Sequence, residues 1–96
     1  FEGALTDITS AITIAPDNAI YQAEEGSIYL RMQELQKAQQ SIEKAIALDP
    51  DFASSHRLLG VCLLRQEKKS EACNSFAKAK ELGDPVVDKL IKENCE

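Results

Sequence analysis

The apolar residues of this chain recur at helical spacing over most of its length, and short polar stretches separate the apolar segments. The last segment shows the pattern clearly: Val87, Leu90 and Ile91 share one side of a helix, and charged residues take the rest. We therefore predict an all-helical protein. The expected helices are residues 3–14, 18–31, 35–47, 52–65, 69–82 and 86–94.

The sequence repeats itself with a period of 34 residues. At this offset Gly26 aligns with Gly60, and Ile42 aligns with Phe76. One step back along the chain, Ala4, Ile8 and Ala11 fall into the same register. The further aligned pairs are Tyr29 with Leu63, Ala38 with Ala72, Ala45 with Ala79, and Pro16 with Pro50.

Each repeat combines a glycine in one helix with two alanines, seven residues apart, in the next. Ala38 and Ala45 lie on one helical face, with the larger Ile42 between them. A glycine within a helix costs about 1 kcal/mol relative to alanine. Close packing of two backbones would offset this cost, so we predict that Gly26 faces the alanine helix in an antiparallel hairpin.

The period and the run of Gly26, Tyr29, Ala38, Ile42, Ala45 and Pro50 resemble the tetratricopeptide repeat. The resemblance implies antiparallel helix hairpins stacked into a right-handed α-solenoid, closed by a C-terminal capping helix. Residues 1–16 would be the second helix of a truncated repeat, 17–50 and 51–84 two repeats, and 85–96 the capping helix. The sequence departs from the family pattern at the loop glycine, which is replaced by Gln33 and Glu67.

The net charge of −5 is concentrated in the first third of the chain, which has no Lys or Arg before Arg31. Nucleic acids and anionic membrane surfaces attract basic faces, so we expect neither as a partner. No apolar run approaches the roughly 20 residues of a membrane-spanning helix. Because the chain begins at Phe1 rather than Met, we expect it to be a fragment whose first helix lacks its partner.

The residues that carry chemistry are few and scattered. His56 is the single histidine, and the four glycines are isolated, so no phosphate-binding loop is present. The sequence has no CxxC motif that would indicate a metal site. We therefore expect no enzymatic activity, no cofactor and no metal, and a structural role for His56.

The three cysteines are Cys62, Cys73 and Cys95. Cys62 and Cys73 fall on the two helices of one predicted hairpin, and we expect both to be buried thiols in a reducing compartment, which favours the cytoplasm. A disulfide between these two is the alternative. We expect Cys95, near the end of the last helix, to be exposed and without a role.

In this repeat family the first helices of successive units line a concave groove, and the resemblance implies that a peptide or helix of a partner protein binds there. Some members hold a peptide's C-terminal carboxylate with Lys, Asn and Arg side chains. The corresponding positions here lack such donors, so we expect an amphipathic or partly acidic peptide instead. The predicted partner-binding residues are Ala23, Ser27, Leu30, Arg31, Ser54, Arg57, Leu58, Val61, Leu64 and Arg65. Ile20 and Glu24 are expected to lie beside this stripe on the same helix.

Two other functions remain open from the sequence. The chain could be a structural, self-associating segment, because Leu5, Ile8, Ile12 and Ile14 make its first helix too apolar for one neighbour to cover. A weak homodimer through that helix is then expected. Alternatively, the chain could be a non-catalytic domain of a larger enzyme or regulator.

Overall fold

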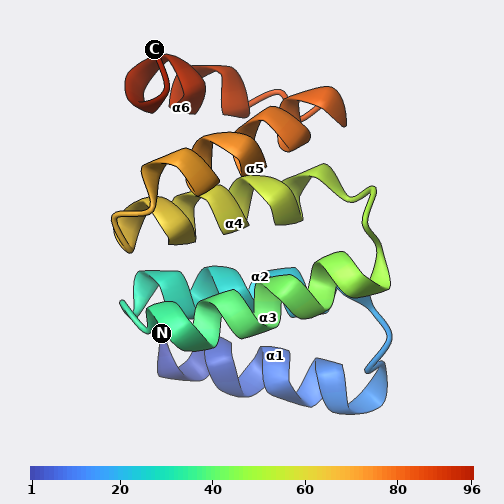
Figure 1. Ribbon diagram of the computed structural model, residues 1–96. Coiled ribbons are helices and arrows are strands. Elements are labelled where there is room, and N and C mark those ends of the chain that lie inside the picture. Colours follow the sequence, from blue (N-terminus) through green and yellow to red (C-terminus); the bar gives the residue numbers. More distant parts are fainter.

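The computed structural model describes all 96 residues and consists of six α-helices joined by short turns (Figure 1). Each helix begins and ends within one residue of the range predicted from the sequence, and the all-helical fold class is confirmed. None of the helices is long and apolar enough to cross a membrane. The helices are α1 (Glu2–Ile14), α2 (Ala19–Arg31), α3 (Leu35–Leu48), α4 (Ala53–Arg65), α5 (Lys69–Glu81) and α6 (Val87–Asn94).

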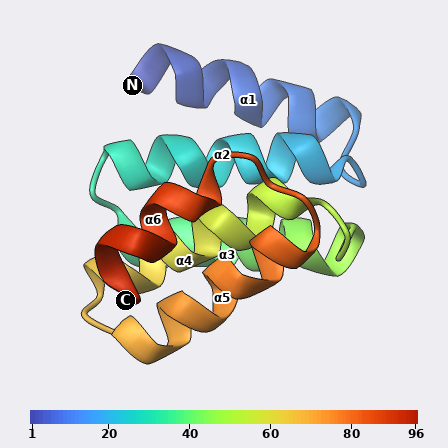
Figure 2. The same cartoon turned by 90° about the horizontal axis from the view of Figure 1, so that it is seen from above.

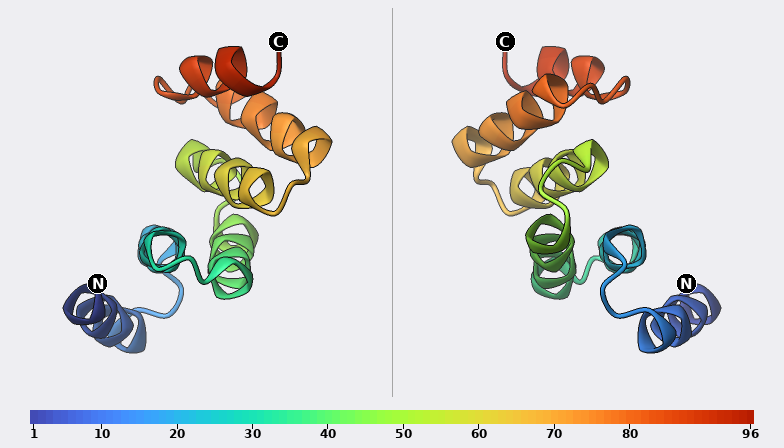
Figure 3. Two further views of the ribbon diagram at one scale, coloured as in Figure 1. Left: turned by 90° about the vertical axis from the view of Figure 1, so that its left-hand side faces the viewer. Right: turned by 90° about the vertical axis from the view of Figure 1, so that its right-hand side faces the viewer.

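The helices form two antiparallel hairpins, α2 with α3 and α4 with α5, stacked through contact between α3 and α4. Helix α1 packs on α2 at one end of the stack, and α6 packs on α5 at the other. Seen from above, α6 lies in front of α4, and α1 runs along one edge of the molecule (Figure 2). The side views show α2 and α4 along one side of the curved stack and α3 and α5 along the other (Figure 3). The first helices of the two hairpins therefore share one face of the molecule.

Both hairpins are held by a glycine set against a large side chain. A Cβ atom built on Gly60 would lie 2.5 Å from Cδ1 of Phe76 and 3.1 Å from the carbonyl oxygen of Ala72. A Cβ on Gly26 would lie 2.5 Å from Cγ1 of Ile42. The close helix packing predicted from the glycine and alanine spacing is confirmed.

The core consists of two apolar clusters joined along the stack. One surrounds Ile42 and the other surrounds Phe76, and both side chains are fully buried. Leu59 and Val61 on α4 pack against both clusters, so the hydrophobic core runs from one hairpin into the next. Neighbouring hairpins thus bury apolar surface against each other, as in stacked repeat proteins.

The turns within the hairpins contain residues with left-handed backbone conformations. Gln33 has φ of 61° and Glu67 has φ of 64°, and each occupies the loop position where the family pattern has glycine. Gly83, with φ of 93°, takes the corresponding place after α5. The turn into α2 is fixed differently, since Oδ1 of Asn18 accepts a 3.1 Å hydrogen bond from the backbone N–H of Tyr21.

The arrangement of the cysteines differs from the sequence-based expectation. Cys73 forms a disulfide with Cys95, with Cα atoms 5.8 Å apart, and Cys62 is the free, buried thiol. Cys73 is therefore not a free thiol, and Cys95 has a covalent partner. The reason is tertiary: α6 folds back across α5 and brings the end of the chain beside Cys73, whereas Sγ of Cys62 is turned toward the Leu35 carbonyl.

Candidate functional site

A groove of about 240 Å³ lies between α2 and α4, on the side of the stack opposite α3 and α5. Helix α2 and helix α4 each supply part of its wall, and the turn that leads into α4 closes one end. The groove is lined by Ile20, Ala23, Glu24, Ser27, Phe52, Ser54, Arg57 and Leu58.

The groove exists because hairpin packing uses only one face of each first helix. Gly26 and Gly60 turn that face toward α3 and α5, which leaves the opposite face free of the hairpin. The free face is largely apolar: Ala23 is buried at the base, Leu58 is half-buried, and Ile20 keeps 51% of its surface exposed. The site is a shallow apolar surface of the kind that accepts side chains of another polypeptide.

Half of the ten residues expected at the partner site line this groove: Ala23, Ser27, Ser54, Arg57 and Leu58. The other five lie elsewhere. Leu30 is buried in the Ile42 cluster; Val61 and Leu64 pack against the core; and Arg31 and Arg65 are exposed near the far ends of their helices.

Ile20 and Glu24, which helical periodicity places beside Ala23 and Ser27, line the groove as well. One lining residue, Phe52, was absent from the expected set. Phe52 precedes the first turn of α4, and no periodic pattern indicates its position. Its place in the groove is decided by the path of the turn between α3 and α4.

The guanidinium of Arg57 is already engaged within the protein. Its Nε donates a 2.8 Å hydrogen bond to Oδ2 of Asp84, whose side chain is only 2% exposed. The other carboxylate oxygen, Oδ1, accepts a 2.8 Å hydrogen bond from the backbone N–H of Val86. Arg57 therefore balances a buried carboxylate and is not an open cationic ligand for a partner.

Arg65 is engaged as well, at the other end of the groove-forming helices. One of its terminal nitrogens donates a 2.8 Å hydrogen bond to the carbonyl oxygen of Leu30, in the last turn of α2. A cation at this place compensates the partial negative charge of the helix end. With Arg57 paired, the one charged lining residue of the groove without a paired countercharge is the exposed Glu24.

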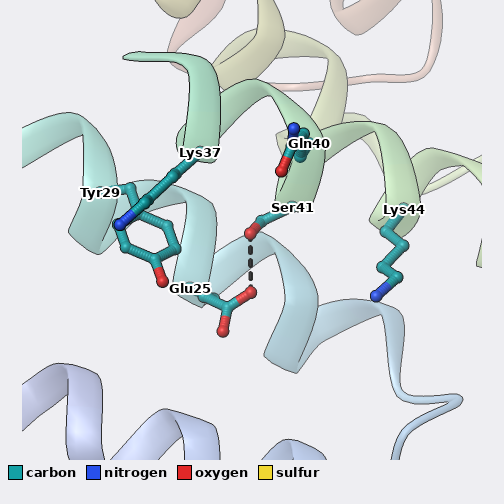
Figure 4. A pocket seen from close by; sticks show the side chains of 6 residues that line it. All are labelled: Glu25, Tyr29, Lys37, Gln40, Ser41 and Lys44. Carbon is teal, nitrogen blue, oxygen red and sulfur yellow. Dashed lines mark hydrogen bonds between the residues drawn. The ribbon is translucent and has the colours of Figure 1, made fainter. Parts of the chain in front are cut away.

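A larger hollow of about 380 Å³ lies between α2 and α3, on the other side of α2 (Figure 4). Its polar groups satisfy one another: Ser41 Oγ donates a 2.6 Å hydrogen bond to Oε1 of Glu25, and Nζ of Lys37 lies 5.8 Å from the centre of the Tyr29 ring. Lys44 flanks the Ser41–Glu25 pair from the same helix as Lys37. Because Tyr29 is the one apolar side chain that lines this hollow, we take the more apolar groove between α2 and α4 as the candidate site.

The polar groups elsewhere form no reactive constellation. Nε2 of His56 lies 2.8 Å from the carbonyl oxygen of Pro50, so the ring donates to the turn before α4 and holds it. No group of three or more His, Cys, Asp or Glu side chains is arranged to hold a metal ion.

Comparison with known proteins relates this arrangement to a family. The tetratricopeptide repeat model matches residues 21–52, which cover α3 and all but the first two residues of α2. Over all 96 residues the chain is 29% identical to small glutamine-rich tetratricopeptide repeat-containing protein 2 of Saccharomyces cerevisiae. The chain spans 28% of the length of that relative.

Solved structures show the same fold. The Sgt2 TPR domain from Aspergillus fumigatus superposes with a TM-score of 0.87 at 22% identity, over 94% of this chain and 62% of that one. The first TPR of Spaghetti, solved with the HSP90 peptide SRMEEVD, gives 0.85 at 18% identity, over 93% and 72%. With the 34-residue period and the glycine-centred hairpins, the family-model match identifies residues 21–52 as a tetratricopeptide repeat, and the solved structures show that the chain shares the fold of stacked tetratricopeptide repeats.

Proposed function

We propose that this chain binds a segment of a partner protein in the groove between α2 and α4 and performs no chemistry on it. The observation that carries the proposal is the free apolar face that the two hairpins leave on their first helices, with Ile20 half exposed beside Leu58. The family includes a domain solved with a bound peptide, which supports a role in protein interaction. Residues 17–50 and 51–84 act as the repeat units that build this surface.

The charges of the groove define the kind of segment that fits. Arg57 is neutralised by Asp84, and Glu24 at the rim stays exposed, so the groove itself offers no free cation. An acidic segment would be repelled by Glu24 and by the overall charge of −5. We therefore replace the expectation of a partly acidic peptide with an apolar or amphipathic segment that is neutral or basic at its ends.

The groove also lacks side chains that could bind a carboxylate, which again disfavours an acidic partner segment. Ala23, Ser27, Ser54 and Leu58 line the groove, and none of them carries a cationic side chain. The HSP90 peptide bound by the Spaghetti domain contains two glutamates and an aspartate. We expect this chain to bind that peptide no better than a scrambled sequence.

The test is a selection from a library of displayed peptides, followed by calorimetry with the best binder. We expect the selected peptides to share apolar side chains and few acidic ones. Ile20→Ser should weaken binding at least about tenfold, the loss typical of removing a central apolar contact. Leu48→Ser is the matched control, because Leu48 is similarly exposed at 40% but lies at the end of α3, outside the groove.

Two results would contradict the proposal. One is equal affinity of the Ile20→Ser and Leu48→Ser variants for the selected peptide. The other is tight binding of SRMEEVD, which would mean that cationic groups outside the groove determine the partner. Circular dichroism of each variant checks that the helices are intact.

A second function, self-association, is favoured by exposed apolar side chains at the two ends of α1. Ile14 is 85% exposed and Phe1, just before the helix, is 68% exposed, while Ile8 is buried and Leu5 and Ile12 are half-buried. We propose that α1 forms a weak homodimer through these side chains, which high salt strengthens by screening the acidic charges. Sedimentation equilibrium over a concentration series tests it, and Ile14→Ser should shift the protein toward the monomer.

A further inference from the structure

The disulfide between Cys73 and Cys95 fastens the capping helix at one end only. Cys73 lies in α5, and Cys95 directly follows the last residue of α6. Both cysteines are half-buried, in contrast to the fully buried Cys62. The bond therefore lies at the edge of the core and not within it.

The other end of α6 is anchored without the disulfide. Val87, its first residue, is fully buried in the cluster around Phe76. The turn before it is fixed by Asp84, which accepts hydrogen bonds from Arg57 and from the backbone N–H of Val86. These contacts hold the start of α6 whatever the state of the two sulfur atoms.

Apart from the disulfide, the C-terminal half of α6 makes only weak contacts with the rest of the protein. Leu90 and Ile91 are only half-buried where they pack against the Phe76 cluster. The single ion pair that joins α6 to α5, between Lys80 and Asp88 at 3.3 Å, has both side chains 63% exposed and contributes little. An isolated helix of eight residues is unstable in water.

We propose that the Cys73–Cys95 disulfide is a reversible redox clasp: it holds the C-terminal half of α6 over the Phe76 cluster, and its reduction releases that half while Val87 stays in place. The released form exposes Leu90, Ile91 and the part of the cluster beneath them. In a reducing compartment such as the cytoplasm, the open form prevails.

The chemistry is thiol–disulfide exchange with a dithiol reductant. A thiolate of the dithiol attacks one sulfur atom of the bond, which forms a mixed disulfide and releases the other sulfur as a thiolate that takes up a proton. The second thiol of the reductant then displaces the first cysteine, which is also protonated. Two electrons pass to the protein, and the dithiol becomes a disulfide.

The third cysteine does not interfere with this exchange. Cys62 is fully buried, and Sγ donates a 3.3 Å hydrogen bond to the carbonyl oxygen of Leu35. Burial raises the pKa of this thiol and keeps it in the unreactive protonated form. Re-oxidation therefore restores the same pair.

The test begins with peptide mapping under non-reducing conditions, where we expect a linked pair of peptides containing Cys73 and Cys95. Hydrogen exchange is then compared between the oxidised protein, the protein reduced with dithiothreitol, and the double variant Cys73→Ser/Cys95→Ser. We expect reduction to remove protection from residues 88–96, to leave residues 19–65 protected, and to increase binding of an apolar fluorescent dye. The double variant should match the reduced protein, and Cys62→Ala should keep the wild-type response.

The reduced protein should also melt at a temperature lower by about 10 °C, because a cross-link that closes a loop of this size limits the unfolded chain. Oxidised glutathione should restore the original melting temperature and protection. Three outcomes would overturn the proposal: three free thiols in the mapped protein, unchanged protection of residues 88–96 after reduction, or loss of protection throughout the chain. The last would make the bond a requirement for the whole fold.

Discussion

Nε of Arg57 and Oδ2 of Asp84 are joined by a 2.8 Å hydrogen bond that links the wall of the groove to the turn before α6. The two residues are 27 positions apart in the chain. Asp84 is almost completely buried, and Arg57 keeps about a quarter of its side chain exposed, at 26%. Arg57, which the sequence suggests as a partner contact, thus also supports the fold.

We predict that Arg57→Met destabilises the protein by about 2 kcal/mol, because it leaves the buried Asp84 carboxylate without its cation. The double variant Arg57→Met/Asp84→Asn should recover part of this loss. Lys78→Met is the control: Lys78 pairs with Glu81 at 3.7 Å on the open surface, and its loss should cost less than about 0.5 kcal/mol. Urea denaturation measures all three, and equal losses for the two single variants would contradict the prediction.

Gly60→Ala should destabilise the protein by about 1–3 kcal/mol, since its Cβ would overlap the Phe76 ring and press on the Ala72 carbonyl. Gly3→Ala provides the comparison. Nothing lies within 4 Å of a Cβ at Gly3, so the same change in α1 should be neutral or stabilising by up to about 0.5–1 kcal/mol. Thermal melts would disprove the packing argument if both variants behaved alike.

Replacing Gln33 or Glu67 with glycine should stabilise the protein by about 0.5–1 kcal/mol each. Both residues have positive φ, which costs an L-residue about 1–2 kcal/mol, partly offset by the extra freedom of glycine in the unfolded chain. Gly83→Ala should have the opposite effect, because φ at Gly83 is 93°. Denaturation midpoints show whether each variant is more or less stable than the native sequence. A loss of stability in the glycine variants would refute the strain assigned to these turns.

The thiol of Cys62 should resist alkylation in the native protein. Burial is the largest cause of its raised pKa, and the nearby Gln66 and Arg65 only partly oppose it. Alkylation followed by mass spectrometry should label Cys73 and Cys95 after reduction, and Cys62 only after denaturation. Rapid native labelling of Cys62 would show that α4 and α3 separate easily.

The raised pKa of Cys62 also has a consequence for stability in alkali. The ordinary thiol pKa lies near 9, so above this pH the unfolded chain loses the proton while the native protein keeps it. Stability is therefore unaffected below about pH 8 and falls as the pH rises through the unfolded and then the native pKa. The difference in unfolding free energy between the native sequence and Cys62→Ala should shrink between about pH 8 and 10.

The sequence by itself determined the helices and the way they pair. Apolar periodicity places all six helices, and the alternation of Gly26 with Ala38 and Ala45 indicates which faces meet. These features are local, because they depend on spacing along one helix and on the absence of a side chain at one position. The same spacing identified Ala23 and Ser27 as groove residues.

Only the tertiary structure decided which groups meet across the stack. The pairing of Cys73 with Cys95 and of Arg57 with Asp84 depends on how α6 and its turn fold back onto α5 and α4. The position of Phe52 in the groove depends likewise on the path of a turn. Helical periodicity gives the face on which a side chain lies but not the angle at which the next helix crosses it, and that angle determines which side chains come into contact.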